Sequence, residues 1–435
     1  MKPLKIAIAG LGTVGAEVAR LLLTDAVFLA DRAGRPLQLM AVSIRDRNRD
    51  RGLPSEALEK IVFADDPVSL ADDEDVDVII ELMGGSEGPA RSLVMAALEK
   101  GKAVVTANKA LLAHHGQEIA IKAEAAGLPL LAEAAVAGGI PALKTLREGL
   151  AANRVRRVSG ILNGTCNYIL STMAETGKDF DTVLADAQAL GYAEADPSFD
   201  IDGVDAAHKL ALLSAMAFGV APDMSALSIT GIRQVSAVDF SLARDIGYAV
   251  KLLAVAECEE DGNPVCRVSP AMVPVSAQLA KVDGALNAVE VEAEPVGPIV
   301  NIGAGAGAGP TASAVLADVI DIARGRVSAF FGMPAAQLAR PAGIGVLQRS
   351  SRYYIRLTVE DRPGVLADVT AVLRDEAVSV EALLQHGPVD GDGLVSVVLT
   401  THAAPETSIQ AVLARLPTLD CVHRPPVAMP VWALG

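Results

Sequence analysis

Positive charge is scarce in this chain of 435 residues. Its 37 lysines and arginines are outnumbered by 53 aspartates and glutamates, which gives a formal net charge of −16. Nucleic acids and anionic membranes both reward clustered positive charge. We therefore expect neither a nucleic acid nor a membrane as a partner.

Cysteine is also rare, and no long apolar run is free of helix breakers. The four cysteines show neither metal-ligand spacing nor the density of a disulfide scaffold. Reduced thiols and the absence of a signal-peptide pattern predict a cytoplasmic location. The uncharged stretch 295–317 is long enough to cross a membrane, but its five glycines and three prolines predict a loop.

Apolar residues are abundant and fall into three successive patterns, enough for two or three domains. Residues 1–135 alternate strand-like and helical runs, which predicts a parallel doubly wound sheet. Residues 136–340 mix helices at 182–190, 203–218 and 311–324 with strand-like runs, an α+β pattern. Residues 341–351 are predicted to be a linker. Residues 352–435 follow a βαββαβ order, typical of a ferredoxin-like module.

The segment GLGTVG, residues 10–15, follows the first strand-like run and opens a helix. Its glycines permit a tight turn, a close approach of the backbone to a pyrophosphate, and close helix packing. The helix N-terminus then binds the phosphates. The pattern predicts a dinucleotide site whose contacts are Gly10, Leu11, Gly12, Thr13, Val14 and Gly15.

The second strand-like run ends in AVSIRDRNRDR. Sites specific for NAD usually place an acid near this strand end, to bind the ribose hydroxyls. Arg45 stands there instead, with Arg47 close by, and a guanidinium suits the 2′-phosphate of NADP. Asp46 argues the other way, and Arg45 as a plain surface residue is the alternative. NADP is favoured, and NAD stays possible.

The stretch EADPSFDIDGVDAAHKLALL, residues 194–213, holds five carboxylates and then one lysine in an apolar run. If Asp202 caps a helix that starts near Gly203, Asp205 and Lys209 lie one turn apart on one face. The rest of that helix is apolar, so it is expected to be buried all round. A partly buried Asp–Lys pair is a candidate acid/base site. A solvated acidic face is the alternative.

Three further segments contain candidate ligand contacts. Lys109, in VVTANKALLA, follows a strand at the carboxyl edge of the sheet, where ligands of such folds bind. Asn163, Gly164 and Thr165, in ILNGTCNYIL, suit a small polar substrate, although an ordinary turn explains them equally well. The glycine-rich NIGAGAGAGP, residues 301–310, lets backbone approach a ligand, or it is a flexible connector.

These segments together resemble homoserine dehydrogenases over residues 1–340. The shared motifs are GLGTVG, TANK, EAAVAGGIP, GILNGTCNYIL, GYAEADPSFDIDGVDAAHKL and GAGAGAGPTASAV. The segment DRPGVLADVTAVL resembles an ACT domain, as in the long bacterial form of the enzyme. Cys166 stands where the family often has threonine, beside the expected substrate loop.

The resemblance implies NAD(P)-dependent interconversion of L-aspartate 4-semialdehyde and L-homoserine, in threonine, methionine and isoleucine biosynthesis. It implies that Lys209 donates the proton, that Lys109 polarises the carbonyl, and that Asp205 holds the substrate or orients Lys209. Glu194 would bind the substrate amine, beside Asn163, Gly164 and Thr165. It also places Gly85, Ala107, Lys109, Gly305 and Gly307 at the coenzyme.

The family also binds a sodium ion through loop carbonyls, and by match these belong to Glu133, Val136, Gly138 and Ile140. Catalysis and dimerisation are implied for residues 136–340, in a homodimer or homotetramer. The ACT module implies an amino-acid effector, with L-threonine favoured, or else a dimerisation appendage. Two other functions stay open at this point: another NADP-linked dehydrogenase of amino-acid pathways, and a non-enzymatic ACT-type sensor.

Overall fold

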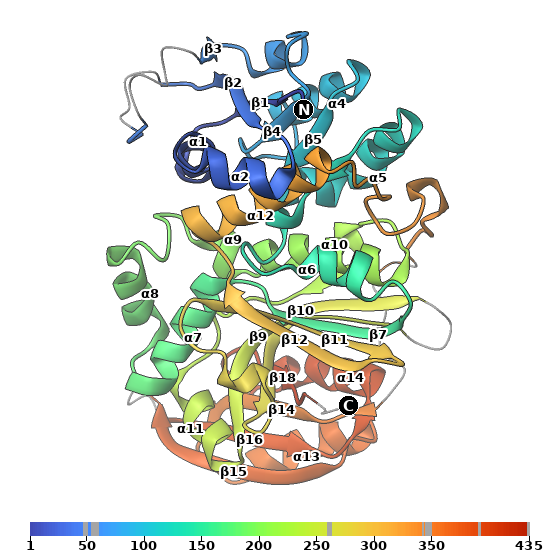
Figure 1. Ribbon diagram of the computed structural model, residues 1–435. Coiled ribbons are helices and arrows are strands. Elements are labelled where there is room, and N and C mark those ends of the chain that lie inside the picture. Colours follow the sequence, from blue (N-terminus) through green and yellow to red (C-terminus); the bar gives the residue numbers. More distant parts are fainter. Residues whose placement is uncertain are drawn as a thin grey trace.

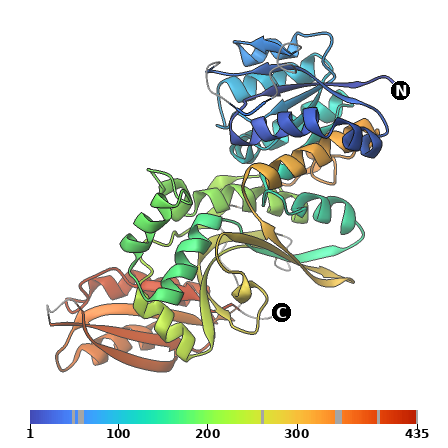
Figure 2. The same cartoon turned by 60° about the vertical axis from the view of Figure 1, so that its left-hand side comes forward.

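A computed structural model of the chain describes residues 1–46, 51–53, 61–258, 263–341, 343, 350–389 and 393–432. Most of the predicted linker, and Arg47, lie outside the described residues. The molecule is elongated, with an N-terminal lobe and a C-terminal lobe at opposite ends and a central lobe between them (Figure 1, Figure 2).

The N-terminal lobe is built on a parallel six-stranded sheet in the order β3-β2-β1-β4-β5-β6. The chain moves outward from β1 in both directions, which is the doubly wound topology predicted from the sequence. The elements are β1 (Leu4–Ala9), α1 (Thr13–Thr24), α2 (Ala26–Ala33), β2 (Leu37–Ser43), β3 (Val62–Ala64), η1 (Pro67–Ala71), β4 (Val78–Glu81), α4 (Pro89–Glu99), β5 (Ala103–Thr106), α5 (Lys109–Ala125), β6 (Leu130–Leu131) and η2 (Glu133–Ala135).

The apolar run LPLLAEAAV, residues 128–136, would predict a longer strand than the structure has, since β6 has only two residues and a 3-10 turn, η2, follows it. Hydrogen bonds at Glu133 explain the early end. Its backbone N–H donates to the carboxylate of Asp318, 2.8 Å away, instead of to a neighbouring strand. Its own carboxylate accepts from the backbone N–H groups of Leu143 and Lys144 at 2.9 and 2.8 Å.

The central lobe contains a mixed six-stranded sheet in the order β12-β11-β7-β9-β10-β8. Helices cover one face of it, which confirms the α+β pattern (Figure 2). The elements are α6 (Ala142–Lys144), η3 (Thr145–Gly149), β7 (Arg154–Ile161), α7 (Gly164–Thr176), α8 (Phe180–Ala189), α9 (Ser198–Ile201), α10 (Val204–Phe218), η4 (Met224–Ala226), β8 (Leu227–Ile229), α11 (Ala237–Asp245), β9 (Tyr248–Cys258), β10 (Pro264–Pro274), η5 (Leu279–Lys281), β11 (Leu286–Glu294), β12 (Gly297–Ala304), α12 (Ala308–Ala323) and η6 (Ala335–Gln337).

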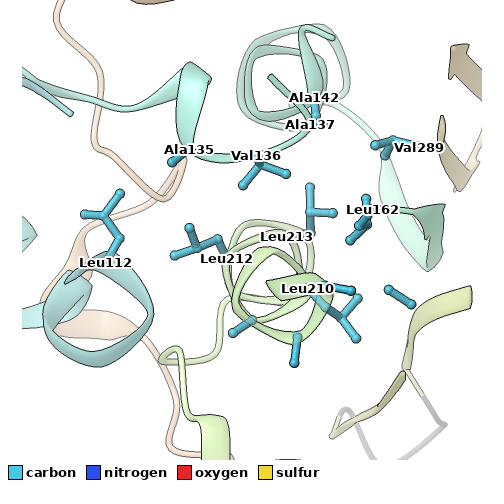
Figure 3. Packing of buried hydrophobic residues seen from close by; sticks show 14 of the residues in the cluster. Leu112, Ala135, Val136, Ala137, Ala142, Leu162, Leu210, Leu212, Leu213 and Val289 are labelled. Atoms are coloured by element: carbon cyan, nitrogen blue, oxygen red, sulfur yellow. The ribbon is translucent and has the colours of Figure 1, made fainter. Parts of the chain in front are cut away.

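Helix α10 is buried on all sides, as its sequence predicts. Every residue from Asp205 to Ala215 is buried. Figure 3 shows Leu210, Leu212 and Leu213 of this helix between Leu112 of α5 and Leu162 beyond β7. The predicted cap is wrong, however. The N-cap is Gly203, which has a left-handed backbone with φ of 86°, and the side chain of Asp202 pairs with Arg233 instead.

Helix α12 leaves the central lobe and packs on the N-terminal one (Figure 1). Ala312, Val315, Leu316 and Val319 belong to the same apolar cluster as β1 and α1. The apolar face of α12 is therefore covered within a single chain. The residues just before α12, 303–307, lie beside the turn that follows β6, where Gly139 N donates to the Ala304 carbonyl oxygen at 3.1 Å. Within the described ranges, no helix is both long and apolar enough to cross a membrane.

The C-terminal lobe has the predicted βαββαβ order and an antiparallel sheet, β15-β16-β14-β18. Its last strand has four residues, fewer than the sequence run CVHRPPVAMPV at 421–431 would predict. The elements are β13 (Ser350–Ser351), β14 (Tyr353–Glu360), α13 (Val365–Asp375), β15 (Val380–Val389), β16 (Leu394–Thr401), β17 (Ala404–Pro405), α14 (Glu406–Arg415), η7 (Leu416–Thr418) and β18 (Val427–Pro430), with β13 and β17 paired apart from the main sheet.

Buried polar contacts join the C-terminal lobe to the central one. The fully buried carboxylate of Asp239 in α11 accepts hydrogen bonds from the Tyr354 hydroxyl at 2.6 Å and from Arg356 Nε at 2.7 Å. Arg267 of β10 donates to the Tyr353 hydroxyl at 2.9 Å. The lobe is thus docked on the central lobe through its first strand and is not a loosely tethered appendage.

Candidate active site

The glycine motif forms the turn between β1 and α1. Gly10 has φ of 95°, and a methyl group on its Cα would lie 2.8 Å from the Leu82 carbonyl oxygen. A methyl group on Gly15 would lie 2.0 Å from the Gly10 carbonyl oxygen. Gly12 differs, because a methyl group there would meet nothing within 4 Å. Packing demands glycine at the first and third positions, whereas Gly12 leaves open space before the first turn of the helix.

The start of α1 is suited to a phosphate group. Gly12 is its N-cap, no side chain caps it, and its first turn, which contains Thr13 and Val14, has no acidic residue. The first backbone N–H groups of such a helix lack helical partners, and its dipole favours an anion. A pyrophosphate bound next to Gly12 would satisfy them. The residues present fit the phosphates of a dinucleotide.

Arg45 is exposed just beyond β2 and lines a cleft of about 500 Å³ together with Gly10, Gly12 and Asp46. The cleft includes one residue that the sequence analysis missed. Arg51 lines the same cleft, and its Nε donates to the Leu11 carbonyl oxygen at 2.9 Å. The local sequence carries no signal for this contact, because it joins residues 40 positions apart.

Three of the remaining coenzyme candidates, Gly85, Ala107 and Lys109, follow other strands of the same parallel sheet. Gly85 follows β4, with φ of 85°, and its carbonyl oxygen accepts from the Asn108 side chain at 2.7 Å. Ala107 and Lys109 follow β5, which pairs with β4. Residues 303–307, here called the glycine-rich loop, include Gly305 and Gly307 and lead into α12. The contact of these residues with a coenzyme stays a prediction.

A buried carboxylate joins the predicted catalytic residues. Asp205 Oδ2 accepts from Lys209 Nζ at 2.7 Å, and Asp205 Oδ1 lies 3.0 Å from Lys109 Nζ. Lys209 and Asp205 come from α10 in the central lobe, whereas Lys109 begins α5 in the N-terminal lobe. Lys209 Nζ also donates to the Leu162 carbonyl oxygen at 2.6 Å. Two ammonium groups from two lobes therefore share one carboxylate.

The charges in this cluster favour the ionised carboxylate. Burial by itself would raise the pKa of Asp205, but the ammonium groups of Lys209 and Lys109 outweigh it and hold that pKa well below its ordinary range. The Asp205 side chain is 6% exposed, whereas that of Lys109 is 32% exposed. Lys109 therefore faces the solvent side of the cluster, where a substrate would enter.

The predicted substrate loop, residues 162–165, is fixed beside the cluster. Asn163 caps α7 by accepting from Cys166 N at 2.8 Å, and its Nδ2 donates to Asp205 Oδ2 and to Asp200 Oδ1, each at 2.8 Å. The Thr165 hydroxyl donates to Asp200 Oδ2 at 3.1 Å. Sequence analysis gave Asp200 no specific role. The structure makes it a shared acceptor that holds this loop in shape.

Glu194 stands apart from the cluster. It is exposed, and among the described residues its carboxylate makes no hydrogen bond or ion pair. Its backbone carbonyl oxygen accepts from the Gln188 side chain at 3.0 Å. The structure does not bring Glu194 into contact with Asp205 or Lys209, so its role at a substrate amine stays a prediction.

His208 is a second residue that the sequence analysis missed. It is buried next to Lys209, and its ring centroid lies 5.4 Å from those of His114 and Phe199. Burial lowers its pKa to about 4, and His114 and Lys109 act in the same direction. An imidazole in this setting stays neutral at ordinary pH and adds no third positive charge to the cluster.

Three of the four predicted sodium ligands lie in a tight turn, residues 136–140, here called the cation turn, and Glu133 lies in the 3-10 turn just before it. Ala137 and Gly138 both have left-handed backbones, with φ of 55° and 54°. Val136 and Gly138 are buried, and their carbonyl oxygens accept no hydrogen bond from the part of the chain that the structure describes. The carbonyls of Glu133 and Ile140 do accept, from Val136 N and Ala142 N. Unpaired buried carbonyls suit a hard cation.

Models of known protein families match three successive parts of the chain. Residues 10–133 match the homoserine dehydrogenase NAD-binding domain, residues 141–320 match homoserine dehydrogenase, and residues 353–417 match the ACT domain.

Full-length relatives point the same way. The chain is 45% identical to a homoserine dehydrogenase of Neisseria gonorrhoeae over 98% of both chains, and 42% identical to one of Pseudomonas aeruginosa over 100% of both. A crystal structure of a homoserine dehydrogenase from Thiobacillus denitrificans matches all of this chain and 99% of its own, with 42% identity and a TM-score of 0.90. A hyperthermophilic archaeal homoserine dehydrogenase in complex with NADPH matches 74% of this chain and 97% of its own, with 27% identity and a TM-score of 0.62. The chain therefore belongs to the homoserine dehydrogenase family, and it is an oxidoreductase with an NAD-binding domain, a catalytic domain and an ACT domain.

Proposed function

We propose that the cluster of Lys109, Asp205 and Lys209 is where this enzyme interconverts L-homoserine and L-aspartate 4-semialdehyde. The observation that carries this proposal is the sharing of one buried carboxylate by two lysines from two lobes. The cluster lies where the coenzyme-binding sheet edge meets the central lobe. A group bound between the lobes would face both the coenzyme and the ammonium groups.

Lys209 acts as the proton donor in the reduction of the semialdehyde. The nicotinamide, when bound, supplies or accepts the hydride. Reduction places negative charge on the substrate oxygen, and the Lys209 ammonium stabilises that charge and protonates it. In the reverse direction, the neutral amine of Lys209 takes the hydroxyl proton. Lys109, on the more exposed side of Asp205, polarises the same oxygen.

Asp205 is the positioning group of this pair. It accepts from Lys209 at 2.7 Å and from Asn163 at 2.8 Å, so the ammonium and the substrate loop are held by one carboxylate. Gly164 and Thr165 complete the loop, and a methyl group on Gly164 would lie 2.8 Å from the Ala285 carbonyl oxygen. Glu194 is retained as the partner of the substrate amine, because its exposed carboxylate has no partner among the described residues and can bind a cation.

The coenzyme is NADP in preference to NAD. The motive is Arg45, which lines the same cleft as the glycine motif and can bind the 2′-phosphate. The archaeal relative named as a complex with NADPH supports this choice.

A sodium ion is proposed to bind at the cation turn, on the unpaired carbonyls of Val136 and Gly138. It would brace the turn against the glycine-rich loop, whose Ala304 carbonyl oxygen accepts from Gly139 N at 3.1 Å.

The ACT domain is proposed to bind L-threonine, a product formed downstream of homoserine. The candidate binding segment is VEDRPGVLAD, between β14 and α13. The N-cap of α13, Gly364, has φ of 96°, and the helix start leaves free N–H groups for a carboxylate. Calorimetry of the full chain with millimolar L-threonine tests this effector. No heat of binding and no inhibition would rule out threonine as the effector.

The assembly is proposed to be a homodimer or homotetramer. The location is proposed to be cytoplasmic, in keeping with four free cysteines.

A substrate screen tests the function itself. Reduction of NADP or NAD is followed by absorbance with L-homoserine, L-serine, L-threonine and other amino alcohols. Homoserine should be the preferred substrate by at least about tenfold in kcat/KM, since a polar site rejects substrates that leave its groups unpaired. Faster turnover of another amino alcohol would assign the chain a different reaction.

A further inference from the structure

Asn287, the second residue of β11, is a buried side chain without partners. The residue is 1% exposed, and neither its amide nitrogen nor its amide oxygen has a hydrogen-bond partner within the described residues. Leaving a buried polar group unpaired costs about 1–3 kcal/mol, and a leucine of similar size would avoid that cost. The stability of the protein without ligands therefore does not explain why this position holds an asparagine.

The strand order places Asn287 between the two halves of the active site. Strand β11 lies between β7 and β12, and Asn287 is opposite Gly303 of β12. The end of β7 leads into the substrate loop, whereas the end of β12 leads into the glycine-rich loop. The side chain thus stands where the substrate-side and coenzyme-side loops come together.

Close contacts show that the Asn287 side chain lies directly against the glycine-rich loop and beside the substrate loop. A methyl group on Gly305 would lie 2.0 Å from Asn287 Cγ, and one on Gly164 would lie 3.5 Å from Asn287 Oδ1. Beyond Gly305, a methyl group on Gly138 would lie 2.4 Å from the Gly305 carbonyl oxygen. The cation turn, the glycine-rich loop, the Asn287 amide and the substrate loop are therefore stacked in direct succession.

We propose that Asn287 is a positioning residue for hydride transfer, whose amide gains hydrogen bonds to the glycine-rich and substrate loops when coenzyme and substrate bind. Gly164 and Gly305 approach the amide and carry no side chains, so a small shift of either loop on binding can bring a backbone N–H or C=O group within hydrogen-bond distance of it. These bonds would fix the spacing between the reacting groups. A misplacement of about 1 Å can cost a hundredfold in rate. The inference rests on the proposed function of the two loops.

The test is the variant Asn287→Leu, which keeps the volume and removes the amide. No internal hydrogen bond is lost, so the melting temperature without ligands should be unchanged or higher. The kcat for homoserine should fall by about tenfold or more, because the reacting groups are no longer held at the right spacing, with the KM for coenzyme within about twofold. The deuterium isotope effect with homoserine labelled at carbon 4 should rise, because hydride transfer becomes slower.

A matched control is Asn167→Leu. Asn167 is equally buried, but its amide donates to the carbonyl oxygens of Val282 and Leu286 at 3.0 and 3.1 Å. This control should lose melting temperature where Asn287→Leu does not. A wild-type kcat and isotope effect in Asn287→Leu would overturn the inference, as would a fall in its unliganded melting temperature equal to that of the control.

Lys209→Ala, assayed in parallel, separates the inference from the proposed function. If Lys209→Ala is inactive and Asn287→Leu is normal, only the role of Asn287 fails. If Lys209→Ala is fully active, the proposed site itself is wrong.

Discussion

Lys109 Nζ and Asp205 Oδ1 lie 3.0 Å apart, although the two residues are held by different lobes. Lys109 is the first residue of α5 in the N-terminal lobe, and Asp205 lies in the first turn of α10 in the central lobe. An ion pair between lobes fixes the position of the coenzyme edge relative to the acid/base group.

Asn163→Asp separates the two jobs of Asn163. The carboxylate can still cap α7 through Cys166 N, but it loses the Nδ2 donor that serves Asp205 and Asp200. It also places a third carboxylate beside them. We expect the kcat/KM for homoserine to fall by about 10–100-fold, in line with the roughly 1.5–3 kcal/mol of a hydrogen bond to a charged group. Steady-state kinetics measure this, and Asn153→Asp, remote from the cluster, should change nothing.

Arg45→Ala should raise the KM for NADP by about tenfold or more and that for NAD by less than about twofold, because only NADP carries the extra phosphate. Arg51→Ala serves as the comparison. Its side chain holds the Leu11 carbonyl, so its loss should affect both coenzymes alike. Equal effects of Arg45→Ala on the two coenzymes would remove it from the phosphate site.

His208 should make stability depend on acid pH. Its folded pKa of about 4 lies below its ordinary 6.5, so the unfolded chain binds more protons between these values. Stability is therefore unaffected above pH 6.5 and decreases as the pH falls toward 4, by about 3 kcal/mol at most. The facing groups are His114 and Lys109 of α5, with Asp205 and Lys209 of its own helix.

Urea unfolding of wild type and His208→Leu across about pH 4–7 measures this effect. The variant should lose most of the decline between pH 6.5 and 4, while the exposed His402→Gln should retain it. The same slope in His208→Leu as in wild type would show that other groups cause the acid sensitivity.

Tyr354→Phe tests the docking of the ACT domain. The change removes the hydroxyl that donates to the fully buried Asp239, which keeps its bonds to Arg356. We expect a loss of about 1–3 kcal/mol in the free energy of unfolding, the usual cost of a buried unpaired group. Tyr168→Phe is the control, since within the described residues the Tyr168 hydroxyl donates no hydrogen bond.

The buried contacts between the central lobe and the ACT domain make removal of that domain a poor test of regulation. A chain that ends at residue 348 would leave Asp239 without Tyr354 and Arg356, and Arg267 without Glu406. Removing one partner of a buried charge costs about 3–5 kcal/mol. We therefore expect such a chain to unfold at a markedly lower temperature than the full chain, and point variants in the ACT loop are the better test of the effector.

Local patterns carried much of the fold and part of the site. The apolar runs of β1, β2, β4 and β5, and the glycine motif between β1 and α1, were recognisable because each is set by neighbouring residues. The pair of Asp205 and Lys209 was predictable for the same reason, since residues four apart meet on a helix. The mistaken cap at Asp202 was also a local prediction, and it failed because Gly203 adopts a left-handed backbone and Arg233 takes the Asp202 carboxylate.

Contacts between distant residues could not be predicted from the chain alone. Arg51 reaches Leu11, and Asp200 reaches Asn163. Asn287 comes close to Gly305 because β11 pairs with β12. The early end of β6 likewise depends on Asp318, 185 residues away from Glu133. Such contacts have no periodic signature in the sequence.

The central claim is that Lys209 moves the proton in the hydride-transfer reaction. The direct test is the single-turnover rate of NADP reduction by homoserine in Lys209→Ala, with NADP affinity measured in parallel. Lys102→Met is the control, because Lys102 is buried at the opposite edge of the sheet, bonded to the backbone of Asp73 and Val76. We predict a rate at least about a hundredfold lower in Lys209→Ala, with NADP affinity nearly intact and the control unaffected. A wild-type rate in Lys209→Ala would contradict the account.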